Sequence, residues 1–598
     1  MNTSDFLMRR LIEWGVTRIY GYPGDGINGI MGAFDRIDGA IEFIQVRHEE
    51  MAAFMATAHA KFTGEVGVCM ATSGPGAIHL LNGLYDAKAD HVPVVAVIGQ
   101  AATTTLGGSY QQEVDLQRLF NDVCDYAYTA SSPMAVRHIV DRAFRTAKGY
   151  RGVTAIIVPK DIQEEKYINP PHKHNTLHSS VGYCEPVVLP ARSDLQKAAD
   201  ILNGCSRVAI LVGAGCLNAT DEVIAVAERL GAGVAKALLG KASVPDDLPF
   251  VTGTIGLLGT LPSIDMMERC DALLMVGTSF PYAEFLPKEG QARGIQIDID
   301  AANLGLRYAT ELNLIGDAAA TLRELLPLLD RKNDRSWIDG IIRTKQKWSE
   351  SELARSEVTA DPINPQAVFV SLNKYLPDRA ILTGDAGTAT NWYARNIDMR
   401  RGMKGSLSGG LATMGGAVPY AIAAKFAFPD RVAVACTGDG AMQMNGSAEL
   451  LTVKKYWKKW ADPRLIFLVL HNDDLNQVTW EMRVESGDPK FEASQDLPTF
   501  PYASYADSIG LLGIRVDRPE QLNDAWQRAF AADRPVVFEA MVSADIAQLP
   551  PHISLTQAHN LMSALVKGDP DEGNVIKESI KSVMAGVLPH ATHSGGAR

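Results

Sequence analysis

The chain has 598 residues, of which 46% are hydrophobic, and its formal net charge is −12 at pH 7. This length is too great for a single domain, and two to four domains are expected. The acidic balance argues against a nucleic-acid-binding protein, because phosphate binding needs a surplus of Lys and Arg. The sequence has no apolar signal core and no stretch of about 18 apolar residues, so we expect a chain that does not span a membrane. The seven cysteines lie far apart, which favours reduced thiols in the cytoplasm over a zinc site or a disulfide framework.

Short apolar runs alternate with amphipathic segments along most of the chain. Each run is rich in Val, Ile or Leu and ends in small or polar residues; the runs are residues 18–23, 65–74, 92–100, 207–215, 271–279, 379–387, 431–440 and 464–472. This pattern is typical of parallel strands that are buried on both faces and joined by crossover helices. It predicts an α/β fold built from doubly wound parallel sheets.

Two stretches interrupt this alternation and suggest domain boundaries. Residues 166–193 are rich in proline, histidine and serine, and residues 331–362 are highly charged. We therefore predict three domains followed by a tail, at residues 1–165, 190–330, 360–550 and 551–598. The first and third domains share one succession of strand, glycine turn, helix and strand, at residues 65–100 and 431–472. This predicts two similar modules that cooperate at one site.

In the first domain, Glu49 begins a segment that has alanines at helical spacing. The residues on that face are Ala52, Ala53, Ala56 and Ala60. A glutamate on an alanine face is expected to pack against a neighbour, and a solvated Glu49–Glu50 pair is the alternative. The glycine turn of residues 73–76 follows the next predicted strand.

In the second domain, the pattern of residues 207–216 predicts a strand that is followed by glycines. A single glycine-rich turn of this kind is a weak signal for a nucleotide site. The pattern alone also allows a domain that binds nothing.

In the third domain, Asp439 lies between two glycines at the end of a predicted strand, and Asn472 follows the next strand. Ligands of doubly wound sheets sit at the carboxyl ends of strands, so these two oxygen donors are expected side by side. Such hard oxygen donors suit Mg²⁺, which often shares its coordination shell with phosphate. The alternative is that Asp439 only caps the helix that follows.

Together these motifs resemble those of thiamine diphosphate-dependent enzymes. The Gly-Asp-Gly motif with the later strand that ends in Asn472 is similar to the metal-binding signature of that family, although 30 residues separate Gly440 from His471, a few more than usual. His471 replaces a frequent Asn, and Asn476 stands where the family usually has Gly, a change that Asn tolerates because it adopts left-handed backbone. The resemblance extends over residues 1–585 and is closest to pyruvate oxidases and the quinone-linked pyruvate dehydrogenases of bacteria, on residues 46–54, 81–94, 277–282 and 547–558.

The resemblance implies a set of residues for thiamine diphosphate. The side chains of Asp439 and Asn472 and the backbone carbonyl of Asp474 would bind Mg²⁺, which holds the diphosphate. Glu49 would act on the aminopyrimidine ring, and Met414 would bend the cofactor, unless it is an ordinary core methionine. Residues 384–388 would form another strand end that faces the diphosphate. The other implied catalytic residues are His79, Gln112 and Glu481, and the other implied binding residues are Ala412, Thr413, Gly440, Ala441, Asp473, Leu475, Asn476, Gln477 and Val478.

The middle domain resembles the flavin-binding domain of pyruvate oxidases. Residues 256–259, 277–287 and 294–300 carry this resemblance. It implies that FAD is contacted by Gly213, Ile255, Gly256, Leu257, Leu258, Thr278, Ser279, Phe280, Pro281, Tyr282 and Asp298. The alternative is a domain that keeps the shape but binds no cofactor.

The activity implied is that of an oxidoreductase. A flavoprotein with thiamine diphosphate, Mg²⁺ and FAD would oxidatively decarboxylate a 2-oxo acid, pyruvate first, and pass electrons to oxygen or a quinone. A second hypothesis is an acetolactate synthase-like carboligase in which FAD is structural. A third is a non-catalytic scaffold, against which Glu49, Asp439 and Asn472 argue. Relatives pair the modules across chains, so a homodimer or homotetramer is expected.

Two glutamines depart from the pattern of the oxidases. Gln111 and Gln477 stand where the oxidases usually carry aromatic residues that face the reacting group. Buried amides need hydrogen-bond partners, so a substrate with a polar group beyond the keto carbon is expected to be favoured. If both amides point away or bind water, pyruvate stays the expected substrate.

The tail contains an apolar stripe at helical spacing. In residues 574–588 this stripe consists of Ile576, Ile580, Val583 and Val587. In the quinone-linked relatives a C-terminal amphipathic helix meets the membrane, so the resemblance implies weak peripheral contact with the inner membrane. A helix packed on its own subunit is the alternative.

Overall fold

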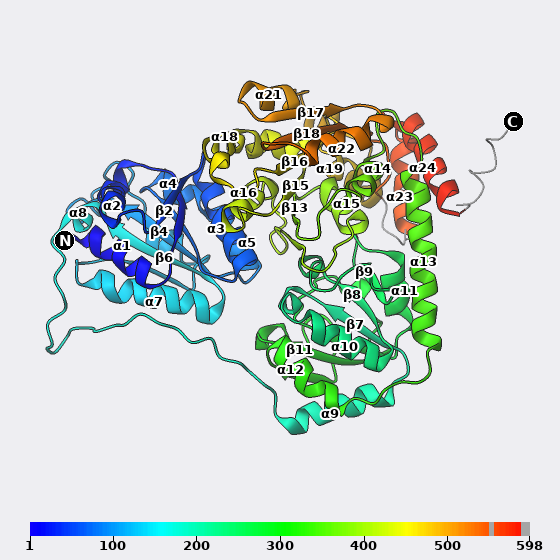
Figure 1. Ribbon diagram of the computed structural model, residues 1–598, viewed down its shortest axis with the longest axis horizontal. Coiled ribbons are helices and arrows are strands. Elements are labelled where there is room, and N and C mark those ends of the chain that lie inside the picture. The colour runs from blue at the N-terminus through cyan, green and yellow to red at the C-terminus, as the bar shows by residue number, and fades with distance from the viewer. Residues whose placement is uncertain (549–554, 588–598) are drawn as a thin grey trace.

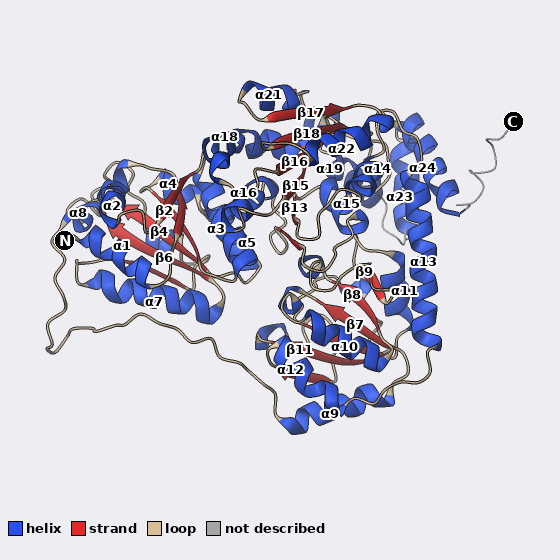
Figure 2. Cartoon of the chain, viewed as in Figure 1, coloured by secondary structure: helices blue, strands red, loops and turns tan. Residues whose placement is uncertain are grey.

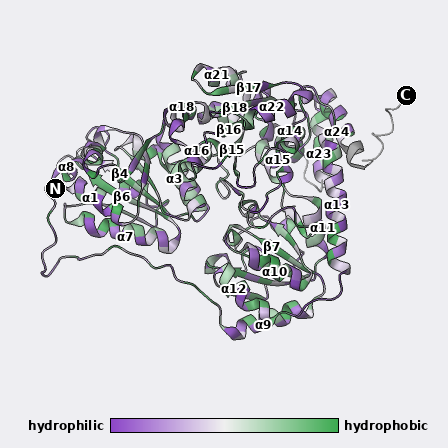
Figure 3. Ribbon diagram, viewed as in Figure 1, coloured by the Kyte–Doolittle hydropathy of each residue, from purple (hydrophilic) through white to green (hydrophobic). Residues whose placement is uncertain are grey.

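The structure is a computed structural model that describes residues 1–548 and 555–587. These residues form three sheets of six strands each, and all the strand pairs within the sheets are parallel (Figures 1 and 2). The helices cover both faces of each sheet, which confirms the predicted α/β fold of three doubly wound sheets. In Figure 3, hydrophobic green follows the strands, whereas the peripheral helices α9 (Arg192–Gly204) and α13 (Ser336–Ser356) alternate green and purple.

The first sheet has the strand order β2-β1-β3-β4-β6-β5. Its strands are β1 (Arg18–Gly21), β2 (Glu42–Gln45), β3 (Gly67–Ala71), β4 (Val94–Gln100), β5 (Tyr126–Thr129) and β6 (Val153–Pro159). Every residue of β3, β4 and β6 is buried, as expected for continuous apolar runs. The surrounding helices are α1 (Thr3–Glu13), α2 (Asn28–Phe34), α3 (Glu49–Thr63), α4 (Pro75–His79), α5 (Leu81–Ala89), α6 (Leu116–Leu119), α7 (Ala135–Tyr150) and α8 (Lys160–Glu164).

The second sheet has the order β9-β8-β7-β10-β11-β12 when it is followed from its other edge. Counted from its own first strand this is 3-2-1-4-5-6, the classic dinucleotide-binding order, with the switch point between β7 and β10. Its strands are β7 (Val208–Val212), β8 (Gly233–Lys236), β9 (Val251–Thr254), β10 (Ala272–Val276), β11 (Arg293–Asp298) and β12 (Leu312–Ile315). Its helices are α9, α10 (Thr220–Leu230), α11 (Leu261–Arg269) and α12 (Ala318–Leu325).

The third sheet has the order β14-β13-β15-β16-β18-β17. Counted from its own first strand this order is the same as that of the first sheet, so the prediction of two similar modules is confirmed. Its strands are β13 (Ile381–Gly384), β14 (Lys404–Leu407), β15 (Ala433–Gly438), β16 (Leu465–His471), β17 (Leu512–Val516) and β18 (Val536–Met541). Its helices are α14 (Pro365–Leu372), α15 (Thr388–Asn396), α16 (Ala417–Ala427), α17 (Asp439–Ala441), α18 (Ser447–Tyr456), α19 (Asn476–Glu481), α20 (Glu492–Gln495), α21 (Tyr502–Ser508) and α22 (Leu522–Phe530).

The two segments that interrupt the alternation differ in structure. Residues 168–190 have no regular secondary structure and run along the outside from the first sheet to α9 (Figure 1). The charged stretch 331–362 is mostly the long helix α13, because Ile338 and Ile341 give it one buried apolar face while none of its charged residues is buried. The three sheets lie within the predicted domain ranges, and the exact boundaries stay a prediction.

The first and third domains meet through two alanine-rich helices, α3 and α16, which pack against each other in one hydrophobic core. Small side chains on α3 and α16 allow these two helices to approach closely. On another side of α3, a Cβ at Gly83 of α5 would lie only 2.5 Å from the Ala53 Cβ, so glycine is needed there as well. Because α3 begins at Glu49, this packing sets the first domain's candidate catalytic residue against the third domain.

The last two helices are α23 (Leu555–Val566) and α24 (Glu572–Val587), and α24 packs against α13. Val575 of α24 is buried, whereas Ile576 and Ile580 are exposed. None of the helices in residues 1–548 and 555–587 combines the length and apolar character needed to cross a membrane.

Candidate active site

Asp439 lies at the carboxyl end of β15 and is almost completely buried. Its Oδ2 accepts hydrogen bonds from the backbone N–H groups of Asn472, at 2.8 Å, and Asp473, at 2.7 Å. These bonds cross to the end of the neighbouring strand β16, so Asp439 is not simply a cap of its own helix. Burial raises the pKa of Asp439 to about 6. Among the described residues no Lys, Arg or His forms an ion pair with this carboxylate, so a cation would relieve its desolvation.

The neighbouring donors also fit a hard cation. The side-chain oxygen of Asn472 accepts only a 3.2 Å bond from the Asp474 N–H in the described part of the chain. The carboxylate of Asp474 accepts hydrogen bonds from the Thr479 hydroxyl and the Asn476 amide, each at 2.9 Å, and forms an ion pair with Lys490, at 3.2 Å. This leaves the backbone carbonyl of Asp474, whose part as a metal ligand stays a prediction of the resemblance. A carboxylate, an amide oxygen and a carbonyl form a donor set suited to Mg²⁺.

His471, which ends β16, is held between two carboxylates. Its Nδ1 lies 2.8 Å from Glu539 Oε1 and its Nε2 lies 2.7 Å from Asp473 Oδ1. Burial by itself would lower the pKa of His471, but the two carboxylates outweigh it and the pKa is raised. Glu539 of β18 therefore holds the segment of residues 471–474 in place. Sequence reasoning missed Glu539, because nothing local marks a glutamate in the middle of a strand as a partner of another strand.

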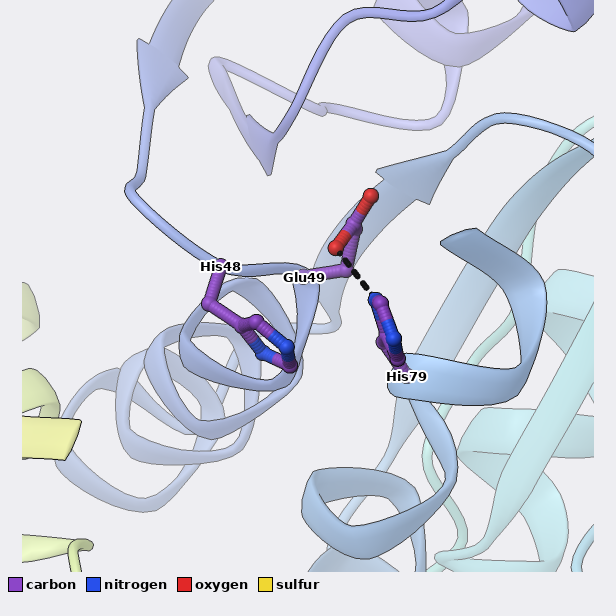
Figure 4. Close-up of side chains that lie close together, drawn as sticks. All are labelled: His48, Glu49 and His79. Carbon is purple, nitrogen blue, oxygen red and sulfur yellow. Dashed lines mark hydrogen bonds and ion pairs between the residues drawn. The ribbon is translucent and has the colours of Figure 1, made fainter. Parts of the chain in front are cut away.

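Glu49 is buried at the start of α3, and its Oε2 lies 2.9 Å from His79 Nδ1 (Figure 4). Figure 4 also shows His48 beside this pair, and the rings of His48 and His79 lie 4.3 Å apart. A Cβ at Gly76 would lie 3.1 Å from Glu49 Oε1, so the glycine turn leaves room for this carboxylate. The structure thus brings Glu49 and His79 together and supports the expectation that Glu49 is packed.

Met414 lies in the loop of residues 409–417, against the end of β15. A Cβ at Gly440 would lie 3.3 Å from the Met414 Cε. The carboxylate of Asp385 accepts the backbone N–H groups of Gly415, at 2.7 Å, and Ala417, at 3.1 Å. The Asp385 side chain therefore holds the loop that carries Met414, and the expectation that residues 384–388 face the diphosphate stays a prediction. Burial raises the pKa of Asp385 to about 6.

Side chains from the first and third domains meet directly beside Glu49. The Asn82 amide donates to Glu50 Oε1, at 2.5 Å, and to the Thr413 hydroxyl, at 3.1 Å. Glu50 Oε2 also accepts a long, 3.5 Å bond from Asn445. Asn445 lies on a π-helical turn, Met442–Gly446, of a kind that is frequent at functional sites. One chain therefore brings the Glu49 helix against the Met414 loop. The sequence did not point to Asn82 or Asn445.

The segment after Asp474 joins a network of amide side chains. The Asn391 amide donates to Gln477 Oε1, at 3.0 Å, and to Gln548 Oε1, at 2.5 Å. Gln477 in turn donates to Glu481 Oε1, at 2.9 Å, and Gln548 donates to Asn476 Oδ1, at 2.9 Å. Gln477 therefore has the partners that a half-buried amide needs. Part of the 547–558 motif, residues 549–554, lies outside the described residues.

Gln111 and Gln112 lie apart from this network. Both are exposed, and Gln112 accepts a 3.2 Å bond from the Ser73 hydroxyl beside the glycine turn. In residues 1–548 and 555–587, no hydrogen bond joins either glutamine to residues 475–481. The structure of one chain thus does not bring Gln112 together with Glu481.

The residues expected to contact FAD gather at the carboxyl edge of the second sheet. A Cβ at Gly213, after β7, would lie 2.3 Å from the Gly277 carbonyl, after β10, so glycine alone allows these two strand ends to approach at the switch point. A Cβ at Gly256 would meet Phe280 at 3.2 Å. Asp298 ends β11, is buried, and accepts the Asp300 N–H at 2.9 Å; burial raises its pKa. This edge fits a dinucleotide.

Three family models match the chain in succession. Residues 1–119 match the N-terminal TPP binding domain of thiamine pyrophosphate enzymes, residues 195–325 their central domain, and residues 385–540 their C-terminal TPP binding domain. The matched ranges contain Glu49, the carboxyl edge of the second sheet and Asp439 respectively.

Curated relatives match over almost the whole chain. The chain is 36% identical over 567 residues to the "putative thiamine pyrophosphate-containing protein YdaP" of Bacillus subtilis (strain 168). The match covers 94% of this chain and 96% of that protein. It is 30% identical over 550 residues to the pyruvate oxidase of Lactiplantibacillus plantarum (90% and 88% covered). It is 28% identical over 545 residues to the large subunit of acetolactate synthase isozyme 3 of Escherichia coli (strain K12) (88% and 92% covered).

Proposed function

We propose a reaction for this protein from one premise: the chain belongs to the thiamine pyrophosphate enzyme family. The family makes it a thiamine diphosphate-dependent enzyme of 2-oxo acids. Within that class we propose an oxidoreductase that oxidatively decarboxylates a 2-oxo acid, pyruvate first, with FAD as the internal electron acceptor and oxygen or a quinone as the final one. The observation that supports FAD binding is that Gly213, Gly256, the 278–282 segment and Asp298 lie along the carboxyl edge of the second sheet.

In this proposal, the residues of the candidate active site bind the cofactor or move its proton. Asp439, Asn472 and the carbonyl of Asp474 would hold Mg²⁺, and the Mg²⁺ would hold the diphosphate of the cofactor. When bound, thiamine diphosphate supplies the electron sink that lets a 2-oxo acid lose CO2. Glu49 would hold and return a proton at a ring nitrogen of the cofactor, and His79, at 2.9 Å, orients its carboxylate. Met414 would fix the bend of the cofactor from its place beside Gly440.

The alternative reaction is that of an acetolactate synthase-like carboligase, in which FAD would be structural. The resemblance to the Escherichia coli acetolactate synthase supports it nearly as well as the resemblance to pyruvate oxidase supports the oxidase. The test is anaerobic mixing of the purified holoenzyme with a panel of 2-oxo acids while the flavin absorbance is followed. Rapid bleaching by one acid supports the oxidase; acetolactate formation without bleaching supports the carboligase and overturns the FAD step.

We also propose that the enzyme is a cytoplasmic homo-oligomer, a dimer or a tetramer. The motivation is that the side chains of Gln111 and Gln112 are exposed in one chain, although the proposed substrate site would cover Gln112. Sedimentation velocity would contradict the proposal if the active holoenzyme had the mass of one chain.

Replacing both Gln111 and Gln477 by phenylalanine is expected to raise kcat/KM for pyruvate and to lower it for hydroxylated or longer 2-oxo acids. A site built to hydrogen-bond a polar group can discriminate against an analogue that lacks it by about 10⁴-fold. The comparison is kcat/KM across a substrate panel. Gln477→Phe alone would also remove bonds to Asn391 and Glu481, so Gln548→Leu, which disturbs the same network, is the matched control. An unchanged order of preference in the double variant would show that these glutamines do not set specificity.

Deleting residues 574–598 is expected to leave turnover with a soluble dye intact but to remove any activation by lipid vesicles. Ile576 and Ile580 of α24 are exposed, whereas Val575 packs with Trp480, Val484 and Leu565, so weak peripheral membrane contact would use a different face of the helix from the packed one. Residues 588–598 and the side chains of Val583 and Val587 lie outside what the structure describes. If vesicles of anionic lipid neither bind nor activate the full-length enzyme, membrane contact is excluded.

A further inference from the structure

The loop of residues 409–417, which carries Met414, is anchored at both ends by carboxylates from two different domains. At its far end Asp385, on the same sheet, accepts the N–H groups of Gly415 and Ala417. At its near end Asp90, which caps the end of α5 in the first domain, accepts the Gly409 N–H at 2.9 Å and the Gly410 N–H at 2.5 Å. Because one carboxylate takes two consecutive N–H groups, it fixes the orientation of both peptides.

Asp90 is itself held by Lys61, on the helix that begins with Glu49. Lys61 Nζ lies 2.5 Å from Asp90 Oδ2, and it also donates to the Leu407 carbonyl and the Tyr420 hydroxyl, each at 2.8 Å. The side chains of Lys61 and Asp90 are only 8% and 1% exposed, so the pair is a buried one that joins α3, α5 and the start of the loop. Removing one partner of such a pair leaves an uncompensated buried charge.

The near end of the loop also contacts the second domain. A Cβ at Gly410 would lie 2.7 Å from the Ala89 carbonyl of α5, and a Cβ at Gly409 would lie 2.5 Å from the Leu239 side chain of the second domain. Ala412 has a left-handed backbone, with φ of 53°. Glycine adopts many backbone conformations, so a loop this rich in glycine keeps one conformation only if contacts with other segments fix its ends.

We propose that Asp90 is a positioning residue for Met414, so that docking of the first domain on the third sets the shape of the cofactor site. The inference rests on the proposed function, because it gives Met414 its part there. With the near anchor released, Gly409 and Gly410 lose the carboxylate that accepts their N–H groups, while the 3.1 Å bond from Asn82 of α5 to Thr413 stays, so Met414 is held less firmly in its place beside Gly440. Asp385 would still hold the far end, so the loop would stay attached but would not be fixed.

The experiment compares three proteins saturated with thiamine diphosphate and Mg²⁺: wild type, Asp90→Asn, and the double variant Asp90→Asn/Lys61→Met. The readouts are the cofactor affinity from calorimetry, the melting temperature, and the rate at which the C2 hydrogen of the bound cofactor exchanges with deuterium. Asp90→Asn is expected to lower the melting temperature and to slow C2 exchange by about tenfold or more, since small misplacements have large effects on rate. The double variant is expected to recover part of the melting temperature, because the Lys61 ammonium is no longer buried without Asp90 although the buried Asp86 also loses a neighbouring cation, while exchange stays slow.

Two comparisons make the result decisive. Glu311→Gln removes an exposed ion-pair partner of Arg293 on the second domain and is expected to match wild type in all three readouts. Met414→Ala is expected to slow exchange at least as much as Asp90→Asn. Wild-type exchange in Asp90→Asn, recovery of exchange together with stability in the double variant, or wild-type exchange in Met414→Ala would each overturn the inference. A wild-type protein that neither binds thiamine diphosphate nor exchanges its C2 hydrogen would instead overturn the proposed function.

Discussion

Replacing Glu49 by glutamine is expected to lower kcat by about 10²–10⁴-fold, the usual contribution of a positioned acid–base group, while the affinity for thiamine diphosphate stays within a few fold. Glutamine has the size of glutamate, so the space left by Gly76, whose Cβ would lie 3.1 Å from Glu49 Oε1, still accommodates it. Its carbonyl oxygen can also still accept from His79. An amide, however, cannot give up and take back the proton that the ring nitrogen of the cofactor requires.

The direct measurement is the exchange of the cofactor C2 hydrogen with deuterium in the loaded variant. Glu65→Gln is the matched control: Glu65 follows the same helix, its side chain is 66% exposed, and it forms an ion pair with His59, so full exchange and activity are expected. Exchange at the wild-type rate in Glu49→Gln would show that Glu49 is not the catalytic glutamate, whatever happened to kcat.

Replacing Asp439 by alanine is expected to weaken Mg²⁺-dependent binding of thiamine diphosphate by more than about a hundredfold, since loss of a group that only supports a metal ligand already costs about 10–100-fold. Two effects add. The Mg²⁺ would lose a carboxylate ligand, and the N–H groups of Asn472 and Asp473 would lose their shared acceptor, so the other ligands would lose their position.

Calorimetric titration with and without Mg²⁺ measures the effect, and two variants separate its causes. Asp439→Asn keeps one oxygen that can accept both N–H groups, as Oδ2 does, but it loses the negative charge and the second oxygen, which accepts the Gly440 N–H, so it is expected to fall between wild type and Asp439→Ala. Asp507→Asn is the control in the same domain: its Oδ1 also accepts a backbone N–H, from Gly513 at 2.9 Å, but it is exposed and lies on α21. If the affinity of Asp439→Ala stays within a few fold of wild type, the metal role of Asp439 is wrong.

Much of the fold was readable from local patterns. Strands such as Val94–Gln100 and Leu465–His471 are buried at every position and therefore read as continuous apolar runs, which is the signature of parallel sheets covered on both faces. Local patterns did not show that residues 331–362 are mostly helical. Their charge indicated only a boundary between domains, but a helix needs only one apolar stripe, and α13 has one.

For the site, the sequence determined the residues that lie at strand ends or begin helices: Glu49, Asp439 and Asn472 each follow directly from a turn and its flanking periodicity. The chain itself ties Asp439 to Gly440, and the parallel order of β15 and β16 then brings Asn472 beside it. These positions follow from short-range rules, and the resemblance to a known family added the roles.

Only the tertiary structure decided which side chains hold those residues in place. Asp90 meets Gly409 across 319 residues, Lys61 meets Leu407 across 346, and His471 meets Glu539 across 68. None of these partners is marked by spacing or periodicity, because each contact exists only where the first domain packs on the third or where two strands far apart in the sequence pair in one sheet. A buried carboxylate or ammonium group is stable only with a partner in that packed interior. The sequence shows that a residue is charged, but it does not show which distant segment carries the partner.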